Sequence, residues 1–130
     1  MTFPTELKYS KTHEWIKFEA NGTASVGITD YAQQELGALV FANLPQPDDP
    51  VTAGVPFGDV ESVKAVSDLV SPLTATVSEA NEELLDHPDL INSDPYGSWF
   101  IKVRDITGSE DLMDAAEYEE FVKKEKMKEN

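Results

Sequence analysis

The most informative segment of this 130-residue chain is Gly58-Asp59-Val60-Glu61-Ser62-Val63-Lys64-Ala65-Val66-Ser67-Asp68. Lys64 is the one lysine or arginine between Lys17 and Lys102, although that stretch holds more than half of the chain's 25 acidic residues. Chance alone can leave one lysine isolated in so acidic a chain. Evidence that Lys64 has a function must therefore come from the residues around it.

The composition is that of one folded and strongly acidic domain. Hydrophobic residues make up 40% of the chain, with eight prolines and seven glycines, which indicates a globular, turn-rich protein. The formal net charge is −15, so nucleic acids and anionic membranes would be repelled and are not expected as partners. No apolar run reaches membrane-spanning length, and the first residues do not resemble a transit peptide. We expect a cytoplasmic protein, or a mitochondrial-matrix protein if the chain is a processed mature form.

The sequence carries no recognisable catalytic or metal-binding motif. The chain has no cysteine, which excludes disulfides, thiolate catalysis and zinc–thiolate sites. Its two histidines, His13 and His87, are too few and too far apart to indicate a metal cluster, and a structural role is expected for both. No Gly-x-Ser-x-Gly elbow, phosphate-binding loop or dinucleotide glycine motif occurs. We therefore expect no metal site and no catalytic activity.

Short strands separated by turns account for most of the hydrophobic pattern. Asn21-Gly22 and Ser71-Pro72 are turn signals between segments that alternate apolar and polar residues. The segments that predict extended structure are 13–19, 23–28, 38–44, 54–58, 60–70, 73–77 and 99–103. This spacing predicts an antiparallel sandwich or barrel with helices near the C-terminus.

Capping residues predict the first two helical segments. Thr29 is a suitable N-cap for a short helix over 30–36, and Gly37 should end that helix. Asn81 is the predicted cap of one helical turn over 81–86.

The C-terminal region is predicted to be helical. Ser109 is expected to cap a short helix, and a final helix should run to about Lys126 because Asp114 and Glu117 have capping-box spacing. The predicted buried stripe of that helix is Tyr118, Phe121 and Val122. The aromatic residues expected in the core are Trp15, Phe18, Phe41, Phe57, Trp99 and Phe100.

Four blocks of the sequence resemble the glycine cleavage H proteins, in the same order along the chain. The block from Glu61 to Asp68 is similar to the lipoyl-attachment motif of that family. The other blocks are Leu7-Lys8-Tyr9 with His13-Glu14-Trp15, Val26-Gly27-Ile28-Thr29-Asp30-Tyr31-Ala32-Gln33 with Leu36-Gly37, and Leu90-Ile91-Asn92-Ser93-Asp94-Pro95-Tyr96-Gly97. The resemblance covers about residues 7–122. It also separates related carriers, since lipoyl domains of 2-oxo-acid dehydrogenases typically have Asp-Lys-Ala and biotinyl domains Met-Lys-Met where this chain has Val-Lys-Ala.

The resemblance implies a mainly β fold, a barrel–sandwich hybrid of two antiparallel sheets with short helices and a C-terminal helix. It implies a single lipoyl-carrier domain over residues 1–130, with a core at about 7–108 and a C-terminal helical segment at about 109–127. It also places Lys64 at the tip of a tight hairpin. The residues from Val63 to Val66 do not themselves predict that hairpin, because they include no Gly, Pro or Asn.

The function implied by the resemblance is that of a lipoyl carrier with lipoate in amide linkage to Lys64. The implied partners are the pyridoxal-phosphate-dependent glycine decarboxylase, the tetrahydrofolate-dependent aminomethyltransferase, dihydrolipoyl dehydrogenase and a lipoate-attaching enzyme. We expect a monomer. Two alternatives stay open, namely an H-like protein that donates lipoate to other enzymes and an unmodified interaction module. An enzyme in its own right is the least favoured reading.

Three acidic residues are further site candidates. Glu14 and Asp68 match family positions that lie near the loaded arm, although composition alone favours an ordinary surface acid at each. Glu35 stands where relatives often have histidine. Two departures from the family pattern concern loops. Asp48 replaces a common glycine and should tolerate left-handed geometry, and Ser98 replaces a second glycine.

Overall fold

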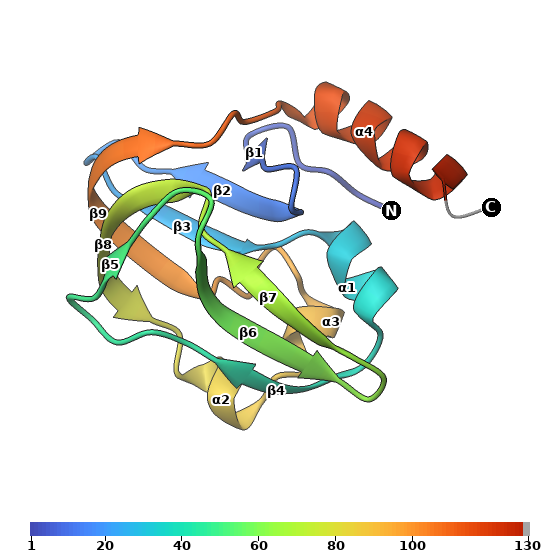
Figure 1. The fold of residues 1–130 in the computed structure, drawn as a ribbon, viewed down its shortest axis with the longest axis horizontal. Helices are drawn as coiled ribbons and strands as arrows, with labels where there is room; N and C mark the ends of the chain where they lie inside the picture. Colours follow the sequence, from blue (N-terminus) through green and yellow to red (C-terminus); the bar gives the residue numbers. More distant parts are fainter. Residues whose placement is uncertain (129–130) are drawn as a thin grey trace.

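The computed structural model describes residues 1–128 and consists of two antiparallel sheets with four helices (Figure 1). The larger sheet has the strand order β1-β2-β3-β9-β8-β5, and the smaller has the order β4-β6-β7. The strands of the larger sheet are β1 (Lys8–Tyr9), β2 (Glu14–Phe18), β3 (Ala24–Ile28), β5 (Pro50–Val51), β8 (Leu73–Ala80) and β9 (Ile101–Ser109). Those of the smaller sheet are β4 (Leu39–Asn43), β6 (Pro56–Ser62) and β7 (Val66–Val70). The predicted mainly β barrel–sandwich hybrid is confirmed.

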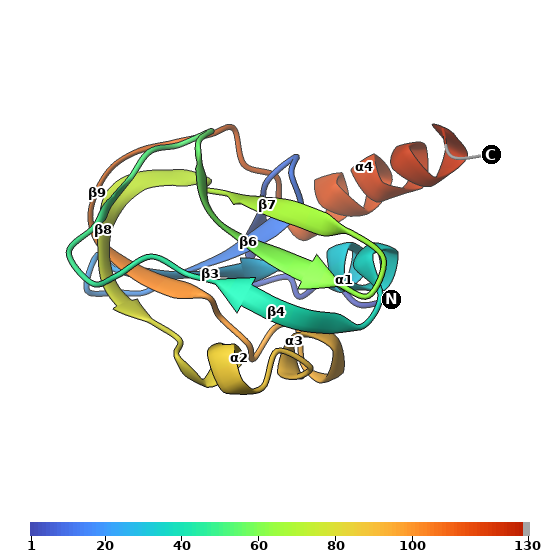
Figure 2. The same cartoon turned by 60° about the horizontal axis from the view of Figure 1, so that its bottom comes forward.

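The main core lies between the two sheets. Ile16 and Val77 of the larger sheet belong to the same buried cluster as Val60 and Leu69 of the smaller sheet, and Figure 2 shows the smaller sheet lying across β3. Along β8 the alternate residues Leu73, Ala75 and Val77 are buried, as the two-residue repeat of a strand requires. Burial of a valine or leucine side chain, as at Leu73 and Val77, contributes about 1.5–3 kcal/mol to folding.

The first helix follows its prediction. Helix α1 (Asp30–Leu36) begins after Thr29, whose Oγ1 accepts a hydrogen bond from the Ala32 amide at 3.2 Å. It ends at Gly37, which has a positive φ of 81°, a conformation that favours glycine.

The helical turn predicted over 81–86 is present, but its predicted cap is wrong, and the helix predicted after Ser109 is absent. The turn at α2 (Glu83–Asp86) has no side-chain cap, because the Asn81 side chain instead donates to the Trp99 carbonyl at 2.8 Å. No helix begins at Ser109, because β9 continues through this residue and pairs it with Leu73 of β8. A short helix that was not predicted, α3 (Leu90–Ser93), follows α2.

The capping box of the last helix is confirmed. The Asp114 side chain accepts from the Glu117 amide at 2.8 Å, and the Glu117 side chain accepts from the Asp114 amide at 3.1 Å. Helix α4 (Ala115–Lys128) then packs on a second apolar cluster built around β1 and β2. Tyr118 and Val122 are buried in that cluster, and Phe121 packs against it.

Of the six aromatic residues predicted to lie in the core, four are at least partly buried and two are exposed. Trp15 and Phe100 are buried as expected, and Phe57 and Trp99 are partly buried. Phe18 and Phe41 are 48% and 49% exposed, so a core role is wrong for both. Phe41 follows a register irregularity in β4, which turns its side chain to the outer face of the sheet.

Asp48 and Ser98, the two residues that replace family glycines in loops, each form a side-chain interaction. Asp48 has a φ of 74°, so it adopts the left-handed geometry expected of the glycine it replaces, and its carboxylate forms an ion pair with Arg104 at 2.7 Å. Ser98 is buried and donates from Oγ to the Leu90 carbonyl at 3.0 Å.

Candidate functional site

Lys64 lies in a tight hairpin between β6 and β7. Glu61 pairs with Val66 across the hairpin, and the Ser62 amide donates to the Ala65 carbonyl at 2.8 Å. The Ser62 hydroxyl accepts from the amides of Lys64 and Ala65, at 3.2 and 3.1 Å. The Ser62 side chain therefore provides the hydrogen-bond acceptor for two backbone amides of the turn. The prediction of a continuous strand over 60–70 is therefore wrong at this turn. Ser62 was the one residue whose side chain could have indicated a turn here.

The hairpin is held against the segment that follows α1. The Val63 amide donates to the Ala38 carbonyl at 3.1 Å. The Lys64 side chain passes over Gly37, since a Cβ built on that glycine would lie 3.7 Å from Lys64 Cε. Lys64 itself is exposed, and no hydrogen bond or ion pair with another of residues 1–128 engages its ammonium group. Its amine is accessible for acylation.

The outer face of the β4-β6-β7 sheet next to Lys64 is apolar and acidic. Strand pairing places Phe41, Glu61 and Val66 in one row across the sheet, and Asn43, Asp59 and Asp68 in the next. The large apolar residues exposed on this sheet and its hairpin are Val40, Phe41, Val63 and Val66, which are 52%, 49%, 75% and 65% exposed. We call these four the hairpin apolar patch.

Glu14 is a buried carboxylate at the start of β2, only 2% exposed. Its Oε1 accepts from the hydroxyls of Ser10, at 2.8 Å, and Thr12, and its Oε2 accepts from the Val70 amide at 3.4 Å. Burial raises the pKa of the Glu14 carboxyl to about 7, although these hydrogen bonds act in the opposite direction. A carboxylate with this pKa would be stabilised in its charged form by a cation brought beside it.

A cleft of about 260 Å³ opens between α1, α4, β7 and the turn that joins β1 to β2. It is lined by Thr12, His13, Tyr31, Ala32, Glu35, Leu36, Ser67 and Glu125, and we call it the α1–α4 cleft. Its lining residue Leu36 directly precedes Gly37, the glycine under the Lys64 side chain. One lining residue of the cleft is therefore the sequence neighbour of the glycine that the Lys64 side chain covers.

The structure places one of the four predicted site residues, Lys64, Glu14, Asp68 and Glu35, in the lining of this cleft. Glu35 lines it and accepts from the Tyr31 hydroxyl at 3.0 Å. Glu14 contacts its wall through Thr12. Asp68 lies next to the lining residue Ser67, but it is exposed and pairs with Asp59 across the sheet. The contributions of Thr12, Tyr31 and Glu125 were missed, because no sequence pattern joins these three segments.

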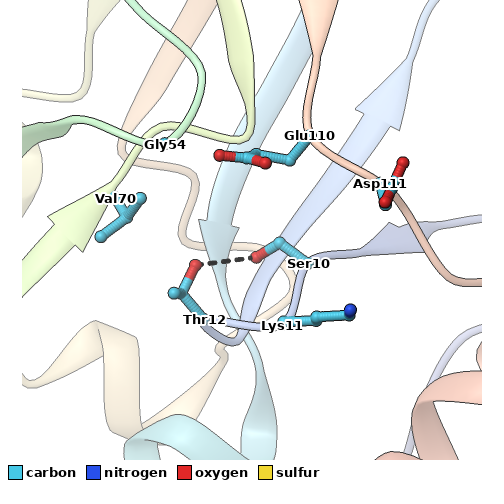
Figure 3. Close-up of a pocket in the computed structure, with 7 residues that line it drawn as sticks. All are labelled: Ser10, Lys11, Thr12, Gly54, Val70, Glu110 and Asp111. Atoms are coloured by element: carbon cyan, nitrogen blue, oxygen red, sulfur yellow. Dashed lines mark hydrogen bonds between the residues drawn. The ribbon is translucent and has the colours of Figure 1, made fainter.

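A second cavity, of about 270 Å³, lies on the other side of Thr12 (Figure 3). Its lining residues are Ser10, Lys11, Thr12, Gly54, Val70, Glu110 and Asp111. Three of these, Ser10, Thr12 and Val70, are the residues that hold Glu14. Figure 3 shows Ser10 and Thr12 bonded to each other, at 3.2 Å between their hydroxyl oxygens. The Glu14 carboxylate is thus held by residues of this second cavity, of which Thr12 also lines the α1–α4 cleft.

The family of this chain follows from its similarity to known proteins. The family model described as glycine cleavage H-protein matches residues 7–125. The chain belongs to the glycine cleavage H-protein family. Family membership supports a lipoyl-carrier role in the glycine cleavage system, with the chain as a carrier subunit and not a catalyst.

Individual members of the glycine cleavage H-protein family match over nearly the whole chain. The glycine cleavage system H protein of Lachnoclostridium phytofermentans is 61% identical over 119 residues, covering 92% of this chain and 94% of the relative. That of Staphylococcus saprophyticus is 50% identical over 125 residues, covering 94% and 98%. A crystal structure of the Mycobacterium marinum glycine cleavage system H protein superposes with a TM-score of 0.85 at 39% identity, covering 89% of this chain and 95% of that one.

Within residues 1–128, every helix falls short of the length or the apolarity that a membrane span requires.

Proposed function

We propose that Lys64 carries lipoate in amide linkage and that the chain is a lipoyl carrier of the glycine cleavage system. The observation that carries the proposal is the position of Lys64, exposed in a tight hairpin with its side chain over Gly37, the residue that follows Leu36 of the α1–α4 cleft. We further propose that residues 1–130 act as one lipoyl-carrier domain, of which residues 129–130 lie outside the described part. The cytoplasmic location stays a prediction.

The residues present fit a lipoyl group. The Lys64 amine is exposed for acylation, and Ser62 holds the hairpin that presents it. When bound, lipoate supplies a dithiol/disulfide pair on a long tether, which can accept an aminomethyl group and be reoxidised. The tether raises the effective concentration of that group at each partner's active site. Acylation also removes the positive charge of Lys64, so the charged groups left on the adjoining sheet face are the carboxylates of Asp59, Glu61 and Asp68.

We infer that the chain receives the aminomethyl group at the glycine decarboxylase, presents it to the aminomethyltransferase and returns through dihydrolipoyl dehydrogenase. The hairpin apolar patch and the acidic residues Asp59, Glu61 and Asp68 surround the base of the arm. An acidic surface favours partners with basic rims and speeds their encounter. A small apolar centre beside it suits transient docking.

The α1–α4 cleft suits the loaded arm between encounters. An aminomethyl group is lost to water as formaldehyde and ammonia unless its nitrogen is held as an ammonium in a protected place. Glu14 offers a desolvated carboxylate that an ammonium would ionise and stabilise. Glu35 adds a second carboxylate at the cleft lining, and Asp68 a more exposed one next to Ser67. We therefore assign Glu14 the main role in retaining the group.

The direct test is mass spectrometry of the chain expressed with and without lipoic acid. The lipoyl mass increment should appear on the peptide containing Lys64 and be lost completely in Lys64→Arg. Lys17 and Lys102, the nearest lysines in sequence, should stay unmodified. Lipoylation of either instead of Lys64 would refute the assignment. Co-purifying partners of the lipoylated chain would distinguish a shuttle from a lipoate donor.

A further inference from the structure

Tyr118 of α4 is bonded to two residues that lie far from it in sequence. Its hydroxyl lies 2.8 Å from Nδ1 of His13, 105 residues away, and 2.7 Å from Oγ1 of Thr29, 89 residues away. All three side chains are largely removed from solvent, with Tyr118 and Thr29 fully buried. Buried hydroxyls need partners for their protons, so the direction of these bonds can be worked out.

Only one direction of these hydrogen bonds gives both hydroxyl protons an acceptor within the group. Thr29 Oγ1 accepts from the Ala32 amide as the N-cap of α1, and its own proton has the Tyr118 oxygen as acceptor. Tyr118 then donates to His13 Nδ1, which requires a neutral imidazole. Burial lowers the pKa of His13, although Glu125 of α4 and Glu35 of α1 oppose that shift. The neutral ring lies among Tyr31, Tyr118 and Phe121.

His13 occupies an unusual position in the turn between β1 and β2. It has a φ of 72°, which is disfavoured for a residue other than glycine and marks a segment held in place by its surroundings. Its backbone is fixed by hydrogen bonds to the Ser10 carbonyl and from the Thr29 amide. The residues on either side are Thr12, which lines the α1–α4 cleft, and Glu14, whose carboxylate Thr12 holds.

We propose that Tyr118 is a positioning residue for the α1–α4 cleft. Its hydroxyl bonds to His13 and Thr29, and so ties α4 both to the turn that carries Thr12 and Glu14 and to the first residue before α1. Helix α4 thus does more than cover an apolar surface, because it fixes two walls of the cleft relative to each other. The inference rests on the proposed role of Glu14 in retaining the aminomethyl group.

Tyr118→Phe is the test, because it removes the hydroxyl and keeps the ring that stacks on Tyr9. The matched control is Tyr9→Phe, since Tyr9 is buried in the same cluster but donates its hydroxyl to the Pro4 carbonyl at 2.6 Å. Two quantities are measured on the full chain. One is the rate of formaldehyde release from the lipoylated, aminomethyl-loaded protein, and the other is the pKa of the His13 ring in the unloaded protein by NMR.

Tyr118→Phe removes both hydrogen bonds and should speed formaldehyde release at least about fivefold, the factor expected for loss of one of them. It should also raise the pKa of His13, because the neutral ring loses a donor. Tyr9→Phe should change neither. If Tyr118→Phe does not fold, Thr29→Val should speed release and Thr29→Ser, which keeps the hydroxyl, should not. The positioning role is overturned if Glu14→Gln speeds release while Tyr118→Phe, or in its place Thr29→Val, leaves both quantities unchanged. It is also overturned if Glu14→Gln has no effect, and in that case the proposed protection by Glu14 fails first.

Discussion

The carboxylate of Glu14 meets the backbone amide of Val70 at 3.4 Å, across 56 residues of sequence. This contact joins β2 of the larger sheet to the end of β7, the strand that leads away from the Lys64 hairpin. A buried acid therefore sits at a junction of the two sheets. Its protonation state should affect both the stability of the fold and the cleft beside it.

The stability contribution of Glu14 should fall as the pH rises. Because the pKa of Glu14 is raised to about 7 from an ordinary value of 4.5, the folded state binds the extra proton between these values. Linkage then makes stability highest below the lower value and lowers it as the pH rises toward 7, by up to about 3 kcal/mol. Glu14→Gln, which cannot ionise, should remove this dependence. Chemical denaturation of both proteins from about pH 5 to about pH 8 measures the difference, and parallel pH profiles would contradict the prediction.

The capping box at Asp114 should contribute about 1 kcal/mol to folding. Asp114→Ala removes the acceptor that holds the Glu117 amide at 2.8 Å and should lower the melting temperature by a few degrees. Asp114→Asn is the matched control, because asparagine is an equally good N-cap. Lipoylation at Lys64 should be unaffected in both. Equal melting temperatures for the alanine variant and the parent protein would show that the box contributes nothing.

Much of the local structure could be predicted, and the failures have identifiable causes. The helix ends at Thr29, Gly37 and Asp114 could be predicted, because each cap is made by residues within one turn of the helix end. The Ser109 prediction failed because pairing with Leu73 of β8 overrode local capping chemistry. Long-range strand pairing of this kind is not visible in a window of neighbouring residues.

The candidate site shows the same division. Lys64 was found through its motif, and the hairpin around it through family resemblance alone, because the turn is made by the Ser62 hydroxyl and not by a glycine. The burial of Glu14 and the bond from Tyr118 to His13 depend on segments brought together by the fold. Sequence patterns can identify the residues of this site but not the contacts that set their chemistry.

Association with the glycine decarboxylase should depend on ionic strength. With a net charge of −15, raising the salt concentration from about 0.05 to about 0.5 M should slow the on-rate, because exposed charges are then screened. Asp59→Asn combined with Asp68→Asn should reduce this salt dependence. Changing Glu82 and Glu83, at the start of α2, to glutamine removes the same charge from another part of the chain and serves as control. Stopped-flow measurements that show a flat salt response would limit the role of the charge to solubility.

The hairpin apolar patch should contribute to docking. Val66→Ser changes a side chain that is 65% exposed, so the fold should lose little stability, while kcat/KM of the decarboxylase with this carrier should fall about fivefold. Val55→Ser is the matched control, because Val55 is 48% exposed but precedes β6 at the end opposite the hairpin. Equal effects of the two substitutions would remove the patch from the docking surface.

Retention of the aminomethyl group should depend on Glu14 and Glu35 together. Glu14→Ala should speed formaldehyde release near neutral pH and leave lipoate attachment unchanged, because Lys64 and its hairpin are untouched. Asp68→Ala should act in the same direction but more weakly, since Asp68 is exposed and its charge is screened. Glu35 lines the same cleft and can mask part of the loss, so the double variant Glu14→Ala with Glu35→Ala is the cleaner test. If the loaded double variant keeps its aminomethyl group as long as the parent protein does, burial in the cleft alone protects the group, and the carboxylates have no part in it.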